Sequence, residues 1–167
     1  MLFETERLYV TKWEDGDLDS LYELFNDTAI KELILPKLTM EETEYIFEKQ
    51  LHAYKNNYPF GRYFIVEKLS NEFIGLLLLR KSKEEEGVEI GYSLIKKHWK
   101  KGYATEIVHE GVNWLFEQKE ISNIYAVTET GNVDSQHVLL KCGFCREDNF
   151  MKKESREINF TLSREYN

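Results

Sequence analysis

The stretch that most constrains the fold runs from Gly87 to Leu115, because its residue pattern changes once, at Gly102. Residues 87–95 have the composition and length of a β-strand. From Gly102 onward, small and apolar residues recur at the spacing of one helix face: Ala104, Ile107, Val108, Gly111, Val112 and Leu115. A strand that leads through a short loop into a helix predicts an α/β chain.

The rest of the chain extends this prediction to the element order β-α-α-β-β-β-α-β-α-β-β, with a mixed sheet. The other predicted strands are residues 7–13, 62–68, 73–80 and 123–128, with a final antiparallel hairpin within 144–162. The other predicted helices begin after Asp17, at the capping-box spacing of Thr39 to Glu42, and at Val133, the last ending at Gly143. We therefore expect residues 1–167 to form one domain.

Composition and charge exclude several classes of protein. A hydrophobic content of 42% supplies a core, and a formal net charge of -8 argues against a general nucleic-acid binder. No apolar run reaches the length of a membrane span, and the first residues lack the apolar region of a signal peptide. The sequence therefore predicts a cytoplasmic protein that binds neither nucleic acid nor membrane.

Two cysteines, Cys142 and Cys145, have a C-x-x-C spacing. They could form a redox pair, or a zinc site in which His137 is the one close additional ligand. The interpretation we favour is packing around the Gly143-Phe144 pair, since an isolated C-x-x-C is a weak signal. No metal is therefore expected.

A cluster of four lysines stands just before the predicted helix, at Lys96, Lys97, Lys100 and Lys101. The first amides of a helix lack internal partners and carry partial positive charge, so an anion can accept their hydrogen bonds. Gly102 and Ala104 leave room for close approach of a pyrophosphate. The alternative is an ordinary helix start beside a solvated loop. The glycine motifs of P-loop and Rossmann proteins are absent.

Several segments, taken in order, resemble the GNAT acetyltransferases, in particular their ribosomal-protein N-acetyltransferase (RimJ/RimL-like) branch. The most specific segment is Glu89-Ile-Gly-Tyr92 followed by Trp99-x-x-Gly-Tyr-Ala-Thr-Glu106. The matching segments also include Glu4–Leu8, Phe73–Leu77, Asn132-x-x-Ser135 and Leu139-x-Lys-x-Gly-Phe144. The resemblance implies a twisted mixed sheet of about seven strands with flanking helices. Its fourth and fifth strands, here 87–95 and 123–128, would separate to leave a gap for the cofactor.

The resemblance also implies a binding site for acetyl-coenzyme A. The backbone of Tyr92, Ser93 and Leu94 would pair with the pantetheine arm, and Asn132 would contact the arm from the other side. The pyrophosphate would lie against the segment from position 99 to position 105. The implied cofactor-binding residues of that segment and the last helix are Trp99, Lys100, Lys101, Gly102, Tyr103, Ala104, Thr105, Asn132 and Ser135.

The expected chemistry is direct attack of an amine on the thioester, which requires a neutral amine. At pH 7 neutrality costs a lysine-like amine about 4–5 kcal/mol and an α-amino group about 1 kcal/mol. The candidate bases are Glu154, which the resemblance implies, and Glu89. The alternative for Glu154 is a solvated carboxylate, and the alternative for Glu89 is a strand residue paired with a neighbouring cation. Many family members have a tyrosine that acts as general acid where this chain has Leu139. Ser135 therefore becomes the candidate proton donor. The alternative is that the Ser135 hydroxyl only belongs to the start of a helix.

The sequence thus predicts an acetyl-CoA-dependent N-acetyltransferase, as a monomer or homodimer. The acceptor amine stays open among a protein N-terminus, an amino acid, a polyamine and an aminoglycoside. One alternative is a CoA-binding module or sensor without turnover, and another is a phosphate-binding scaffold unrelated to CoA.

Overall fold

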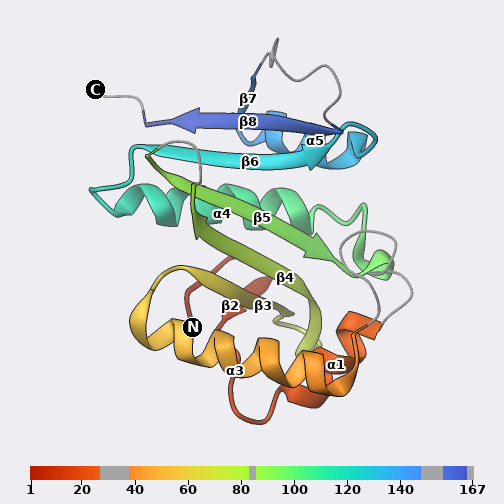
Figure 1. Cartoon of the computed structure of the whole chain (residues 1–167). Helices are drawn as coiled ribbons and strands as arrows, with labels where there is room; N and C mark the ends of the chain where they lie inside the picture. Colours follow the sequence, from red (N-terminus) through yellow and green to blue (C-terminus); the bar gives the residue numbers. More distant parts are fainter. Residues whose placement is uncertain (27–37, 83–85, 148–155, 165–167) are drawn as a thin grey trace. The chain divides into compact units, whose positions relative to one another are not determined.

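The structure is a computed structural model that describes residues 1–26, 38–82, 86–147 and 156–164 (Figure 1). The strands are β1 (Phe3–Glu4), β2 (Leu8–Thr11), β3 (Gly61–Glu67), β4 (Glu72–Lys81), β5 (Val88–Leu94), β6 (Asn123–Glu129), β7 (Cys145–Arg146) and β8 (Glu157–Ser163). The helices are α1 (Leu18–Asn26), α3 (Met40–Asn56), α4 (Tyr103–Glu117) and α5 (Val133–Lys141), with a 3-10 helix, η1 (Lys96–His98).

Hydrogen bonds link the described strands in the order β1-β2-β3-β4-β5-β6-β8-β7. The β5–β6 pair is parallel, whereas the β1–β2, β2–β3, β6–β8 and β7–β8 pairs are antiparallel. The predicted mixed sheet with flanking helices is confirmed. The eight strands found compare with about seven expected, and the two-residue strand β1 is the one that the sequence pattern did not indicate.

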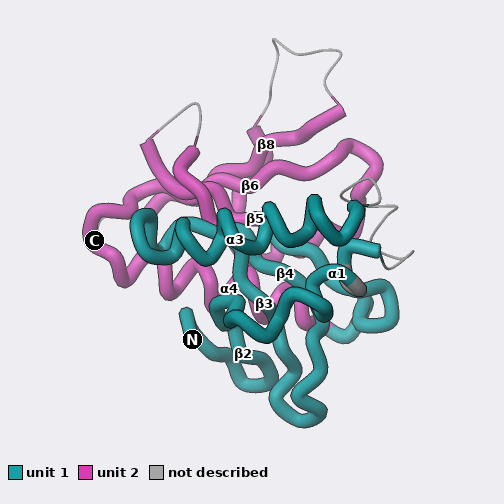
Figure 2. The backbone as a smooth tube through the Cα atoms, turned by 60° about the horizontal axis from the view of Figure 1, so that its bottom comes forward, with its two compact units in different colours: residues 1–78, 92–101 teal, residues 79–91, 102–167 magenta. Residues whose placement is uncertain are grey.

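The chain divides into two compact units (Figure 2). Unit 1 comprises Met1–Leu78 and Tyr92–Lys101, and unit 2 comprises Leu79–Gly91 and Gly102–Asn167. The expectation of one domain over 1–167 stays a prediction.

Unit 1 has an aromatic core beneath a capped helix. The indole of Trp13, 2% exposed, stacks on Phe47 of α3 at 6.0 Å and on Phe64 of β3 at 5.4 Å between ring centroids. The predicted capping box is present, because Thr39 Oγ1 accepts from the Glu42 amide and the Glu42 carboxylate accepts from the Thr39 amide. A cap of this kind contributes about 1 kcal/mol to helix stability.

Unit 2 is built on the long β6–β8 ladder, which runs in antiparallel register from Asn123↔Ser163 to Glu129↔Glu157. The predicted apolar face of α4 is buried, and each of its larger side chains contributes about 1.5–3 kcal/mol by leaving water. Those side chains are Ile107, Val108, Val112 and Leu115. Helix α5 ends as predicted, with Gly143 following it in the left-handed conformation at a φ of 90°.

The predicted final hairpin is confirmed as the antiparallel β7–β8 pair, with Cys145 opposite Thr161. Its intervening residues 148–155 lie outside the described part of the chain. No helix within the described ranges is both long enough and apolar enough to cross a bilayer.

Candidate active site

The helix start predicted after the lysine cluster is present at α4. Gly102 is its N-cap residue, with a φ of 84° and no side-chain cap hydrogen bond, and the Glu106 amide makes the helix bond to the Gly102 carbonyl at 3.1 Å. Helices α3 and α5 differ, because the side chains of Thr39 and Asn132 cap them. The start of a helix is a place where backbone amides can donate hydrogen bonds to an anion.

The loop that precedes this helix start belongs to unit 1 and is held at two points. Trp99 Nε1 donates a hydrogen bond of 2.6 Å to the Leu94 carbonyl at the end of β5. Arg7 Nη1 donates a hydrogen bond of 3.1 Å to the Lys101 carbonyl. Between these points Lys100 has a positive φ of 59°, and Lys100 and Lys101 are exposed. The loop therefore holds two cations at the surface directly before Gly102.

The backbone segment proposed to meet the pantetheine arm is fixed by β4. A Cβ atom on Gly75 would lie 2.1 Å from the Ser93 carbonyl oxygen and 3.0 Å from Leu94 Cα. The Ile95 amide also donates to the Ile74 carbonyl at 2.9 Å. Glycine at this position is thus required by the close approach of the two backbones, a role that the sequence alone did not reveal.

The parallel ladder between β5 and β6 contains the pairs Val88↔Ile124 and Glu89↔Tyr125. Both strands are longer than this ladder, since β5 continues to Leu94 and β6 to Glu129. The printed pairs of this ladder therefore lie at the start of both strands, and the cofactor gap between them stays a prediction.

One candidate base, Glu89, is engaged in an ion pair. Arg80 Nε and Nη2 donate to the two Glu89 carboxylate oxygens at 2.8 and 2.6 Å, and the Glu89 side chain is 13% exposed. Both oxygens are therefore already accepting charge-assisted hydrogen bonds, which favours the ion-paired alternative over proton abstraction. The other candidate, Glu154, lies outside the described residues.

The residues predicted on α5 have local structural partners. Asn132 Oδ1 accepts from the Ser135 amide at 3.1 Å, which caps the helix, and Ser135 is half-buried in its first turn. Leu139, at the position of the family's tyrosine, is 2% exposed and belongs to the core. A leucine that fills the core has no group to protonate a leaving thiolate, so Ser135 stays the candidate donor.

The two cysteines have different environments. Both thiols are free; Cys142 is partly buried, with Sγ 3.6 Å from the Thr105 carbonyl, whereas Cys145 is exposed. Burial raises the pKa of the Cys142 thiol, which makes it less reactive. The packing interpretation thus applies to Cys142 and is wrong for Cys145. Within the described ranges, no group of three or more His, Cys, Asp or Glu side chains is placed to hold a metal.

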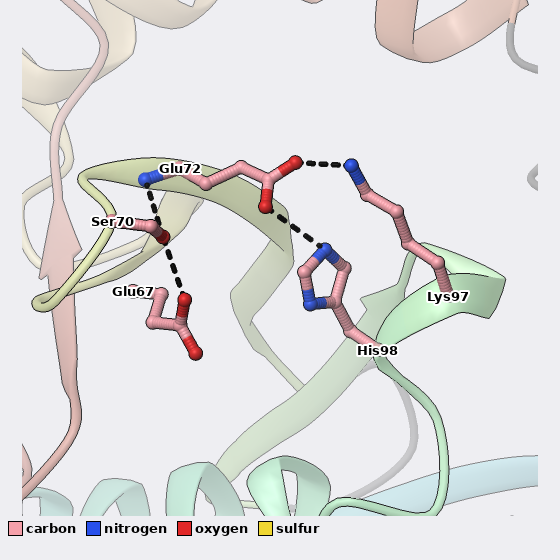
Figure 3. Close-up of polar contacts among 5 residues, drawn as sticks. All are labelled: Glu67, Ser70, Glu72, Lys97 and His98. Carbon is pink, nitrogen blue, oxygen red and sulfur yellow. Dashed lines mark hydrogen bonds and ion pairs between the residues drawn. The ribbon is translucent and has the colours of Figure 1, made fainter.

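An acidic residue that the sequence analysis missed, Glu72, faces η1 (Figure 3). Lys97 Nζ donates to Glu72 Oε1, and His98 Nε2 lies 3.7 Å from Glu72 Oε2. The His98 ring is 3% exposed. A buried ring that faces Glu72 is poorly placed to contact a phosphate group.

The pH dependence of stability should report this burial. Burial lowers the pKa of His98, with smaller contributions from Lys101 and Lys97, whereas Glu72 and Glu67 act in the opposite direction. The folded protein therefore resists protonation, and stability falls as pH drops from the usual histidine pKa of 6.5 toward the lower folded value. We expect His98→Gln to lose less Tm than the wild type between about pH 7.5 and about pH 5.5.

The control for this measurement is His109→Gln, which removes an exposed imidazole from α4. That variant should keep the wild-type change in Tm between the two pH values. An equal pH dependence in His98→Gln and wild type would contradict the role assigned to His98 burial.

Comparisons with known proteins agree with this geometry. A family model described as an acetyltransferase (GNAT) domain matches residues 7–145. The uncharacterized N-acetyltransferase YjdG of Bacillus subtilis (strain 168) is 30% identical over 151 residues, which cover 86% of this chain and 89% of that protein.

Two solved structures share the fold. Spermidine N-acetyltransferase from Vibrio cholerae, in complex with CoA and spermine, has a TM-score of 0.74 at 19% identity, with 93% of this chain and 95% of that chain covered. Ribosomal-protein-S5-alanine acetyltransferase from Vibrio fischeri has a TM-score of 0.76 at 19% identity, with 96% and 95% covered. Because the family model spans most of the sequence, this chain belongs to the GNAT family of acetyltransferases.

Proposed function

We propose that this protein transfers the acetyl group of acetyl-CoA to a primary amine by direct attack of the amine on the thioester. The observation that carries the proposal is the start of α4, which Gly102 leads without a side-chain cap. Membership of the GNAT family supports the identity of the anion as the pyrophosphate of CoA.

The residues present fit this cofactor. The first amides of α4 supply hydrogen-bond donors, and the exposed Lys100 and Lys101 supply positive charge next to them. We assign the pyrophosphate to Trp99 through Thr105 and the pantetheine arm to Tyr92 through Leu94. Asn132 and Ser135 are assigned to the arm's other side. Bound CoA supplies an activated thioester, and the protein supplies its orientation.

The protein's proton transfers follow from the reaction. The neutral amine nitrogen forms a bond to the acetyl carbon, the carbon–sulfur bond breaks, and the leaving thiolate takes a proton. Ser135 Oγ is the proposed donor to the sulfur and regains its proton from solvent, and Glu154 is the proposed acceptor of the amine proton, which it then releases to solvent. Glu89 is less suited to that second role because Arg80 already occupies its carboxylate.

The acceptor that we favour is the α-amino group of a protein N-terminus, as in the ribosomal-protein branch. An α-amino group needs about 1 kcal/mol to be neutral at pH 7, against about 4–5 kcal/mol for a lysine-like amine, so it demands a weaker base. This difference in cost matters because Glu89 is held in an ion pair with Arg80 and is therefore a weak base. The Vibrio fischeri enzyme supports this choice, and the Vibrio cholerae enzyme supports a polyamine as the competing acceptor.

The decisive experiment measures thioester consumption with an amine panel of N-terminal peptides, spermidine, free amino acids and an aminoglycoside. Turnover with peptides above all other amines is the expected result. Turnover with spermidine alone would support the polyamine acceptor instead. Tight calorimetric binding of CoA without turnover on any amine would support the second candidate function, a CoA-binding sensor, which the buried Leu139 favours.

The role of Glu154 is tested by Glu154→Gln. Because the amide has no proton-accepting carboxylate, we expect kcat to fall by about 100-fold while the Kd for CoA changes little. Glu157→Gln, three positions along in β8, is the matched control and should retain turnover. Unchanged turnover of Glu154→Gln at pH 7 would remove this carboxylate from the mechanism.

A further inference from the structure

The Glu72 carboxylate links a rigid hairpin turn to the loop assigned above to the pyrophosphate (Figure 3). Glu72 is the first residue of β4 and directly follows the turn that closes the β3–β4 hairpin. Its amide donates to Ser70 Oγ at 3.2 Å, and Ser70 Oγ donates to Glu67 Oε2 at 2.6 Å. Asn71 has a φ of 54°, which helps the turn to reverse the chain. The backbone that carries Glu72 is thus fixed by its own hairpin.

The other side of this contact is η1. Lys97 and His98 of η1 reach the two different oxygens of Glu72, as a hydrogen bond and at 3.7 Å respectively. The His98 imidazole is almost fully buried, so the 3-10 turn cannot rotate without exposing a packed ring. Both contacts lie within unit 1.

The contact engages one of the lysines before α4. Lys97 pairs with Glu72 while its side chain stays 59% exposed, and Lys100 and Lys101, which follow after Trp99, are also exposed. Between η1 and Gly102, Lys100 has a positive φ of 59°. A loop held in this form before the ligand arrives loses less conformational entropy on binding.

We propose that Glu72 is a positioning residue for CoA, which acts through Lys97 and His98 to hold the pyrophosphate loop in its binding form. This inference rests on the proposed function. A positioning role for Glu72 and a direct electrostatic role predict opposite changes in CoA affinity when the carboxylate is removed. Glu72 is negative, and loss of a nearby negative charge would by itself tighten the binding of an anion. Positioning predicts that the same loss weakens binding.

The test is calorimetric titration of CoA into the wild type, Glu72→Gln, Lys97→Gln and the double variant. We expect Glu72→Gln to raise the Kd about tenfold, because the loop must be ordered on binding. The KM for acetyl-CoA should rise in parallel, while kcat at saturating acetyl-CoA stays within about twofold. The loss of affinity in the double variant should be smaller than the sum of the two single losses, since both substitutions break the Glu72–Lys97 contact.

Glu4→Gln is the matched control, because it removes another carboxylate of unit 1 from an ion pair, with Lys68 at 3.0 Å. Its Kd for CoA should equal that of the wild type. Unchanged or tighter binding by Glu72→Gln, with wild-type CoA binding intact, would overturn this inference and leave the proposed function standing. Failure of the wild type itself to bind CoA would overturn the proposed function. A Tm loss in Glu72→Gln without any change in Kd or KM would also overturn the inference, as a merely stabilising contact.

Discussion

Replacing Gly75 with alanine is expected to lower the free energy of unfolding by about 2–3 kcal/mol, or the Tm by about 4–12 °C. The added Cβ would lie 2.1 Å from the Ser93 carbonyl oxygen and 2.8 Å from Leu94 Cδ2. Two strand backbones would have to separate to relieve this overlap, because a carbonyl oxygen cannot rotate away as a side-chain end can. Thermal and urea unfolding would measure the loss.

The matched control is Gly16→Ala, since a Cβ on Gly16 meets no atom within 4 Å and both glycines belong to unit 1. That variant should unfold like the wild type or slightly later. An unchanged Tm for Gly75→Ala would show that β4 and the end of β5 do not approach as described. Where Gly75→Ala folds, its affinity for CoA should also fall, because Ser93 and Leu94 belong to the proposed pantetheine segment.

Gly102→Val is expected to weaken CoA binding by at least about tenfold, which corresponds to about 1.4 kcal/mol. Gly102 has a φ of 84°, a conformation that a β-branched residue adopts only with strain, and valine would also crowd the proposed phosphate position. Gly102→Asn separates the two effects, because asparagine tolerates a positive φ but still adds a side chain. Isothermal calorimetry with CoA measures both variants.

Gly143→Val supplies the control for strain alone. Gly143, which follows the end of α5, has a similar φ of 90°. A Cβ added there would lie at an ordinary contact distance of 3.7 Å from Leu162 Cδ1. This variant should lose Tm and keep the wild-type Kd. If Gly102→Val binds CoA as tightly as Gly143→Val does, the start of α4 is not the pyrophosphate site.

Most secondary structure was predictable because it follows from local chemistry. The capping box at Thr39 and the left-handed glycine at position 143 are read from a few adjacent residues, and both are present. Strand β1 was missed because two residues have no detectable period, and its pairing of Phe3 with Val10 is a tertiary contact. Local pattern predicts elements well where they are long and poorly where a neighbour creates them.

The candidate site divides in the same way. The lysine cluster and Gly102 lie within one short segment, residues 96–102, so a helix start beside positive charge was predictable from the sequence. Glu72 and Gly75 were not, because each acts on a segment about 20 residues away through a contact that only the fold creates. The Arg80 partner of Glu89 falls between these cases, since an ion pair was expected but its cation was not identifiable.

The start of α4 also has a consequence for the abundance of the protein in a cell. Under the proposed function, CoA binds the folded chain at the start of α4 and not the unfolded chain, so ligand binding adds to folding stability. A ligand at about 100 times its Kd adds about 2.7 kcal/mol of stability, enough to change the unfolded population about 100-fold. Under the proposed function, the lifetime of this protein against proteolysis would follow the supply of coenzyme A, so metabolic state would set the amount of enzyme as well as its rate.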